Sequence, residues 1–137
     1  MILNERQYRL TQARVANADQ AFERAREEAA TLPADLAAIH LAALEGNLDQ
    51  MRAELAAYEA IRDGREPIEA EGLAQLPLTL IRGRIRKHLS QRELAQKLGV
   101  KEQQIQRWEA NLYHGVAIDR LDEIARAVEV RVIEAIG

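Results

Sequence analysis

Apolar residues recur along the first 62 residues of the chain with alternating spacings of three and four. One set precedes Thr31-Leu32-Pro33 and consists of Tyr8, Thr11, Val15, Ala18, Phe22, Ala25 and Ala29. A stronger set follows Pro33 and consists of Leu41, Leu44, Leu48, Met51, Leu55 and Tyr58. An average period of about 3.5 residues predicts two helices with coiled-coil-like seams. The break falls before Pro33 because the residue preceding a proline avoids helical angles.

The very short connection between these helices favours an antiparallel helical hairpin over residues 1–62. Because such a hairpin alone buries little core, we expect it to pair with a second copy of the chain. The alternative is an ordinary amphipathic helix pair that packs on the rest of the protein. Residues 63–72 (DGREPIEAEG) combine glycine, proline and charged residues and therefore predict a linker.

Shorter apolar repeats over residues 73–137 predict a domain of five helices, so the expected fold class is all-α. One helical turn is expected near Leu73–Leu76, followed by helices over 77–88, 90–98, 102–110, 118–128 and 132–136. The expected inward-facing side chains are Leu78, Ile81, Ile85, Leu94, Ala95, Leu98, Ile105, Trp108, Ile118, Leu121, Ile124, Ala125 and Val128. For Val132, Ile133 and Ile136 an extended tail is the alternative to a helix.

Residues 90–109 have the features of a helix-turn-helix. Ser90 and Glu93 form a capping box at a helix start, and Gly99 suits the left-handed position that ends the helix. Ala95 is small where two helices approach, and apolar anchors lie on both sides of the turn at Leu94, Leu98, Val100 and Ile105. Agreement of these features at fixed spacing predicts a DNA-binding unit whose second helix enters the major groove.

The same residues resemble the Cro/cI-type, or XRE, helix-turn-helix family. Residues 90–100 match its "SQxxLAxxLGV" pattern, residues 105–109 match "IxxWE", and residues 118–130 resemble its next helix, "LxxIAxALxV". This resemblance covers residues 78–130 and implies a lambda-repressor-like DNA-binding domain, here placed over residues 73–137. Residues 58–64 resemble a bacterial subgroup with an N-terminal helical extension.

The resemblance also implies a function. We expect a sequence-specific transcriptional regulator, a repressor, that binds a two-fold site on double-stranded DNA as a homodimer. The alternative is an antitoxin of a toxin–antitoxin pair that also represses its own operon, in which the hairpin binds the toxin. Dimerisation through the hairpin or through the C-terminal helices remains open at this point.

The resemblance assigns roles to individual residues of the motif. Glu102, Gln103 and Arg107 occupy positions that read base edges, where Gln suits adenine and Arg suits guanine. Six side chains are expected at phosphates or flanking bases: Gln91, Lys101, Gln104, Gln106, Asn111 and Tyr113. Arg82, Arg86 and Lys87 are further candidates for backbone contacts. Arg84 and Glu109 are expected to form an ion pair that locks the recognition helix onto the scaffold.

Two residues at the start of the recognition helix depart from the family pattern. Glu102 stands where Gln is common, so it either accepts from cytosine N4 or is an acid favoured by the helix dipole. Lys101 replaces the usual Ser or Thr cap and offers a phosphate contact instead.

The charge distribution supports this division of the chain. Residues 78–137 hold 11 Lys/Arg and 8 Asp/Glu, whereas residues 1–77 hold 8 and 14, so balances of +3 and −6 make up the net charge of −3. The chain has no cysteine, its three histidines are far apart, and it lacks a nucleophile motif or a Gly-rich phosphate loop. We therefore expect a cytoplasmic protein that is not an enzyme, with no metal, cofactor or membrane segment.

Overall fold

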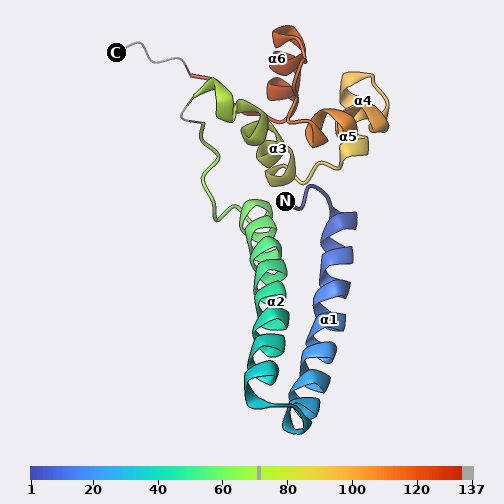
Figure 1. The fold of residues 1–137 in the computed structure, drawn as a ribbon. Coiled ribbons are helices and arrows are strands. Elements are labelled where there is room, and N and C mark those ends of the chain that lie inside the picture. The colour runs from blue at the N-terminus through green and yellow to red at the C-terminus, as the bar shows by residue number, and fades with distance from the viewer. Residues whose placement is uncertain (71, 134–137) are drawn as a thin grey trace. The chain divides into compact units, whose positions relative to one another are not determined.

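The computed structural model describes residues 1–70 and 72–133, and every regular element within them is a helix (Figure 1). The elements are α1 (Glu5–Glu28), a 3₁₀ turn (Ala29–Thr31), α2 (Ala34–Arg62), a second 3₁₀ turn (Leu73–Gln75), α3 (Leu76–Arg86), α4 (Gln91–Leu98), α5 (Glu102–Ala110) and α6 (Ile118–Ala127). They form two compact units that divide between Glu59 and Ala60. The predicted all-α class is confirmed.

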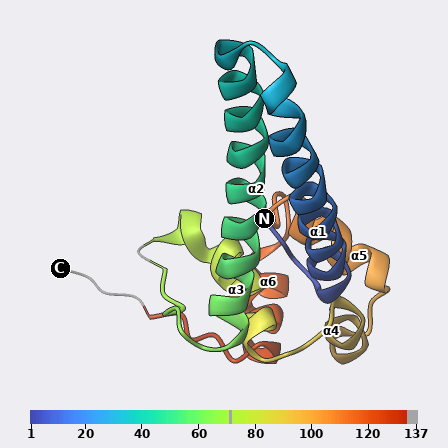
Figure 2. The same ribbon diagram turned by 90° about the horizontal axis from the view of Figure 1, so that it is seen from below.

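The first unit is a hairpin in which α1 and α2 lie side by side and antiparallel (Figure 1, Figure 2). Asn4 caps α1, since its side chain accepts a hydrogen bond of 2.8 Å from the Gln7 amide. Every position of both predicted seams is buried or half-buried in the structure. The 3-4 repeat therefore identified the faces on which the two helices meet.

A crossed pair of tyrosines closes the open end of the hairpin. The rings of Tyr8 and Tyr58 stack with centroids 5.1 Å apart. The Tyr8 hydroxyl donates to Glu59 at 2.5 Å, and the Tyr58 hydroxyl donates to Glu5 at 3.1 Å. Each tyrosine thus binds a carboxylate of the opposite helix, which sets the register between α1 and α2.

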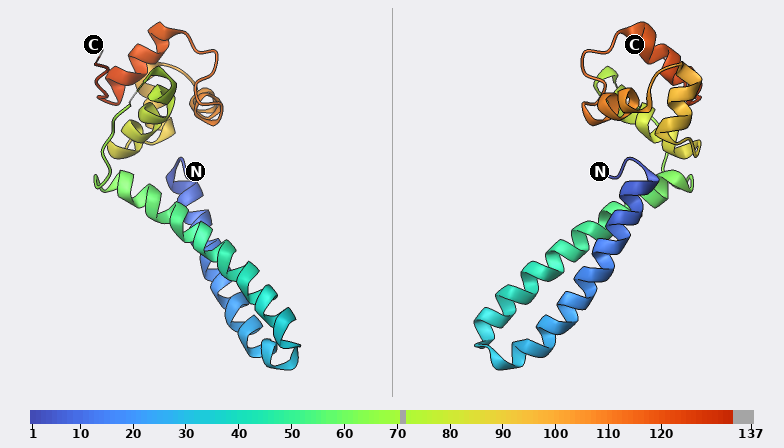
Figure 3. Two further views of the ribbon diagram at one scale, coloured as in Figure 1. Left: turned by 60° about the vertical axis from the view of Figure 1, so that its left-hand side comes forward. Right: turned by 90° about the vertical axis from the view of Figure 1, so that its right-hand side faces the viewer.

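The second unit packs α3, α4, α5 and α6 around one apolar core (Figure 3). Its fully buried apolar side chains are Leu80, Ile81, Leu94, Ile105, Ile124 and Val128. Burial of each such side chain contributes about 1.5–3 kcal/mol. α3 approaches the chain beyond α6 closely, because a Cβ on Gly83 would lie only 2.5 Å from Cγ2 of Val130.

The boundaries and inner face of α3 differ from the prediction. The helix begins at Leu76 and ends at Arg86, two residues before the expected end, because His88 adopts a left-handed φ of 56°. Leu80 is fully buried, whereas Leu78 is only half-buried. α3 buries a face wider than a simple 3-4 repeat indicates, and this face includes Thr79 and Arg84.

Other expected core positions, and the predicted last helix, also differ from the structure. Ile118 is the first residue of α6 and is 75% exposed, so it lies outside the core, and Trp108 is only half-buried. No helix forms at Val132 and Ile133, which are exposed, while Ile136 lies outside the described residues. Glu129, with a φ of 57°, ends α6 and directs Val130 against Gly83.

None of the helices in the described part of the chain carries an apolar stretch long enough to span a bilayer.

Candidate nucleic-acid interface

The turn between α4 and α5 is built as its sequence predicts. The Ser90 hydroxyl accepts from the Glu93 amide at 3.0 Å, and the Glu93 carboxylate accepts from the Ser90 amide at 3.1 Å. The hydrogen bond from the Ser90 amide to the carboxylate, together with the nearby Ser90 side chain, holds the pKa of Glu93 below its ordinary value. Gly99 ends α4 with a φ of 68°, and the Val100 amide closes the turn on the carbonyl of Ala95 at 3.0 Å.

The inner face of α5 is held by a buried ion pair between Arg84 of α3 and Glu109. The guanidinium donates through Nε at 2.6 Å and through Nη2 at 2.8 Å, one bond to each carboxylate oxygen. Its Nη1 donates to the carbonyl of Leu89 at 2.9 Å. Both side chains are almost completely inaccessible to solvent. The expected pair is present, and its bidentate geometry fixes the orientation of α5 on the scaffold.

Gln91, at the start of α4, joins the same network. Its amide Nε2 donates to Oε1 of Glu109 at 2.8 Å, and its side chain is buried. The phosphate contact expected of Gln91 stays a prediction, and it requires at least part of this side chain to turn away from Glu109. In the structure without DNA, Gln91 serves to hold the recognition helix.

The outer face of α5 carries the side chains expected to read DNA. Glu102, Gln103, Gln106 and Arg107 are exposed, and Gln104 is half-buried. Lys101 is the N-cap and is also exposed, and its side chain makes no capping hydrogen bond. The structure thus brings the predicted base contacts and three of the predicted phosphate or flanking contacts, Lys101, Gln104 and Gln106, together on α5 and its N-cap.

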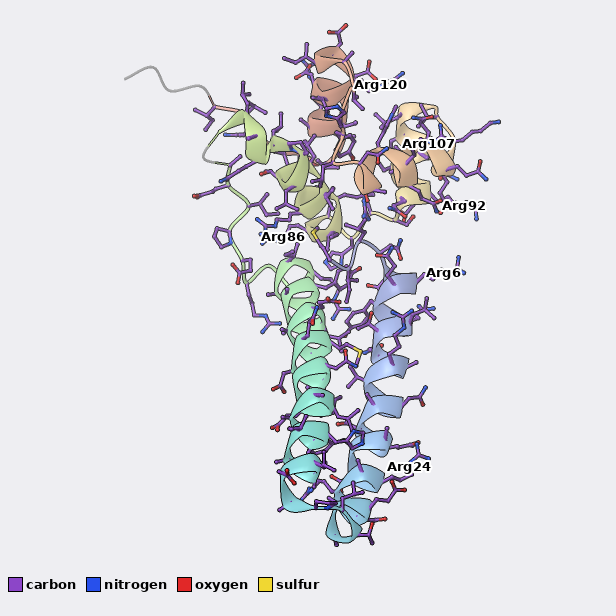
Figure 4. The ribbon with its side chains drawn as sticks, viewed as in Figure 1. Arg6, Arg24, Arg86, Arg92, Arg107 and Arg120 are labelled. Carbon is purple, nitrogen blue, oxygen red and sulfur yellow. The ribbon has the colours of Figure 1, made fainter. Side chains whose placement is uncertain are left out.

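Arg92 is an additional exposed cation on α4 that our sequence reasoning missed. Figure 4 labels Arg92 and Arg107, one on each helix of the motif. Its place as the second residue of α4 is the signal that could have identified it, because side chains at a helix start can lie beside a phosphate bound there.

Tyr113 does not lie on this surface, which corrects its predicted phosphate contact. The side chain is 3% exposed, and the ring lies 6.4 Å from that of Trp108. Burial, together with the charge of Glu109, raises the pKa of its hydroxyl above the ordinary value. That hydroxyl has no hydrogen-bond partner among the described residues. Left-handed angles at Leu112 and Tyr113 turn the ring inward, which a sequence pattern does not reveal.

A cavity of about 410 Å³ lies beside the C-terminal half of α5. Its lining includes cationic and polar side chains and no carboxylate: Gln104, Arg107, Asn111, His114 and Arg120, with Trp108. Arg120 lies over the Trp108 ring at 5.7 Å and pairs with Glu123 at 2.9 Å. Of these residues, the sequence predicted DNA contacts for Gln104, Arg107 and Asn111 but not for His114 in the following loop or Arg120 in α6.

The three other residues predicted to contact the DNA backbone differ in whether their side chains already bind other groups of the chain. Arg86 donates to carbonyls of Ile61 and Glu66, so the structure turns it away from a phosphate role. Lys87 pairs with Glu129, which lowers the pKa of that carboxyl through the hydrogen bond and charge of Lys87. Arg82 is half-buried.

The described residues contain no cluster of three or more His, Asp or Glu side chains that could hold a metal ion.

A family model described as helix-turn-helix matches residues 80–134. Comparison with curated proteins and with solved structures found no match to the chain.

Proposed function

We propose that this chain, in which a helix-turn-helix family model matches residues 80–134, is a DNA-binding transcriptional regulator that acts as a repressor and binds a two-fold operator as a homodimer. The observation that carries the proposal is the division of α5 into two faces. Arg84 and Gln91 hold the inner face through Glu109, while the outer face presents the long polar side chains of Gln103, Gln106 and Arg107 to solvent.

In this proposal α5 enters the major groove with its outer face toward the bases. Gln103 pairs with adenine and Arg107 with guanine, and each bidentate contact supplies about 1–3 kcal/mol of discrimination. Glu102 either accepts a hydrogen bond from cytosine N4 or only stabilises the N-terminus of α5 through the helix dipole. Lys101, Gln104, Gln106 and Asn111 then lie near phosphates or flanking bases, and these contacts fix the position of the protein without reading sequence.

The cavity beside α5 extends this phosphate contact. Arg107, His114 and Arg120 line it together with Asn111, and no Asp or Glu is among its lining residues, although Arg120 is paired with Glu123. A DNA phosphate seated there would lie next to the helix that reads the bases. Phosphate contacts of this kind set the register of a protein on the duplex.

The hairpin supplies the dimer contact in our proposal. Val15, Phe22, Leu44 and Leu55 of its seams are only half-buried within one chain. A second hairpin packed against these seams would remove their remaining apolar surface from water, at roughly 25 cal/mol per Å². Two recognition helices would then face successive major grooves, with half-sites about 34 Å apart.

An antitoxin that represses its own operon is the second candidate. Leu36 and Ile39, near the turn of the hairpin, are 54% and 68% exposed, and a protein partner could cover them. Co-purification with a small basic protein encoded by an adjacent gene would favour this candidate. A homodimer in gel filtration, without such a neighbour, would favour the simple repressor.

Selection of bound DNA from a random pool tests the proposal. We expect enriched sequences with two inverted half-sites separated by about one helical turn. Enrichment of single, unpaired sites would reject the two-fold operator. No enrichment at all would reject sequence-specific binding.

A further inference from the structure

The two helices of the hairpin differ in the surfaces that they turn away from each other. α1 is amphipathic, and its outward positions are mostly charged or polar, as at Arg6, Arg14 and Arg24. α2 instead carries apolar residues around its circumference and is not clearly amphipathic. A helix that is apolar all round is normally buried on all sides. Because α1 covers only one side of α2, the opposite side stays exposed in the single chain (Figure 1).

This opposite side, the outer face of α2, has a 3-4 repeat of its own. It consists of Leu36, Ile39, Ala43, Gly46, Gln50, Ala53 and Ala57, all of them exposed. Leu36 and Ile39 are 54% and 68% exposed although both are large and apolar. Alternating steps of three and four residues keep these positions in one stripe along the helix, as in a coiled-coil seam. α2 therefore has two seams, of which one packs on α1 and the other faces solvent.

The shape of the outer face suits a second copy of itself in the antiparallel direction. Its two bulky side chains, Leu36 and Ile39, lie toward the N-terminal end of α2, and its C-terminal end has two alanines, Ala53 and Ala57. The middle is open, since a Cβ on Gly46 would meet nothing within 4 Å. An antiparallel pair places the bulky end of one copy on the small end of the other. A parallel pair would place bulky on bulky at one end and small on small at the other.

The polar residues beside the outer face favour the same direction. His40 and Glu54 lie on one flank, two helical repeats apart, and an antiparallel pair brings His40 of each copy near Glu54 of the other. An imidazole can donate a hydrogen bond to a carboxylate. A parallel pair would instead bring Asp49 near Glu54 of the other copy twice. In the antiparallel pair Asp49 meets only its own copy, at the water-exposed edge of the contact.

We propose that the outer face of α2 binds the outer face of a second copy of the chain, antiparallel, about a two-fold axis near Asn47. This inference rests on the homodimer of the proposed function, and it names the face on which the second hairpin packs in addition to the half-buried edges of the seams. The contact extends over residues 36–57, about 32 Å at 1.5 Å per residue. Each α2 then lies between its own α1 and the α2 of the other copy, in a bundle of four helices.

Sedimentation velocity with two charged variants of the outer face tests the proposal. Ile39→Glu and Ala53→Glu each place a carboxylate in the apolar contact and should raise the Kd of the dimer more than about tenfold. The matched control is Ala16→Glu, which makes the same substitution at an exposed alanine of α1 and should leave the Kd unchanged. Because Ile39 and Ala53 are exposed in the single chain, both variants should keep the helical content of the wild type in circular dichroism.

Cross-linking tests the direction of the pair without altering the outer face. The chain has no cysteine, so one introduced cysteine is the only thiol. Asn47→Cys places it near the axis, where a short bismaleimide should join the two copies. His40→Cys lies on the same flank, but an antiparallel pair separates its two copies by about 21 Å along the helices. This variant should therefore stay unlinked. A parallel pair would give the same yield at both positions.

The outcomes distinguish this inference from the proposed function. A wild type that stays monomeric both in solution and on its selected DNA would reject the homodimer, and the inference with it. If the wild type is a dimer and both charged variants dimerise equally well, the homodimer stands and the outer face is refuted. If the charged variants lose helical content, cross-linking decides: no product at Asn47→Cys, or equal yields at positions 40 and 47, refutes the antiparallel contact. A different protein that co-purifies with wild type, but not with Ile39→Glu, would also refute a second copy as the occupant.

Discussion

Replacing Glu109 with alanine should destabilise the DNA-binding unit severely although Glu109 makes no contact with DNA in our proposal. The carboxylate accepts two hydrogen bonds from Arg84 and one from Gln91, and it is 1% exposed. Glu109→Ala leaves a guanidinium and an amide in the core without their acceptor. Breaking a buried pair by removing one partner costs about 3–5 kcal/mol.

This loss is a large fraction of the stability that such a unit can have. At about 0.05–0.15 kcal/mol per residue, a unit of roughly 78 residues has an unfolding free energy of about 4–12 kcal/mol. A loss of about 3–5 kcal/mol should lower the Tm by more than about 12 °C. Because α5 depends on Glu109 for its orientation, operator affinity should fall as well.

Trp108, the only tryptophan in the chain, lies next to Glu109 in α5 and reports the unfolding. The unfolding free energy is measured from its fluorescence in guanidinium chloride. The matched control replaces the network with apolar residues: Arg84→Met, Gln91→Leu and Glu109→Leu together. Because well-packed apolar replacements of buried ion pairs are often neutral, this combination should lose less stability than Glu109→Ala alone.

Two results would refute this reasoning. One is a Glu109→Ala protein whose unfolding free energy lies within about 1 kcal/mol of wild type, because leaving the buried Arg84 guanidinium without its acceptor should cost more than that. The other is an apolar combination that loses more stability than the single variant.

Three other predictions follow from single contacts. Arg107→Ala should weaken operator binding by about 1–3 kcal/mol in anisotropy and relax preference at one base pair, and unchanged binding would contradict the assignment of α5. Glu93 should titrate in NMR below its ordinary value of 4.5, so its contribution to stability is present above that pH and is lost as the pH falls through the lowered pKa. Ser90→Ala should raise that pKa only part of the way, because the Ser90 amide still donates. Gly83→Ala should cost about 1–3 kcal/mol by chemical denaturation, whereas Gly46→Ala, in open space within α2, should stabilise by about 0.5–1 kcal/mol.

Local signals explain why most helix positions could be predicted from the sequence. Ser90 and Gly99 bound α4 through side-chain and backbone preferences that act within a few residues. Helix ends without such residues were less accessible to prediction. His88 and Glu129 both take left-handed angles without being glycine, so the early end of α3 and the turn after α6 depend on tertiary packing.

The candidate site was predictable in outline for the same reason. Exposure of Gln103 and Arg107 follows from helical periodicity alone. The buried positions of Gln91 and Tyr113 do not follow from periodicity, because each side chain turns toward a residue of another element. Gln91 turns toward Glu109, and Tyr113 turns toward Trp108. Surface assignment from a motif fails where a buried charge attracts a polar side chain, as Glu109 does Gln91, or where left-handed backbone angles turn a ring inward, as at Tyr113.

The separation of the two faces of α5 has a consequence for how such a protein can diverge. Glu102, Gln103 and Arg107 are exposed, so substitutions there spare the buried core that supports the helix. If these residues read the bases as we propose, two copies that arise by gene duplication could acquire different target sequences by changing only these positions while keeping the same fold. Residues such as Glu109, which in our proposal make no contact with DNA, are the ones that such divergence would leave unchanged.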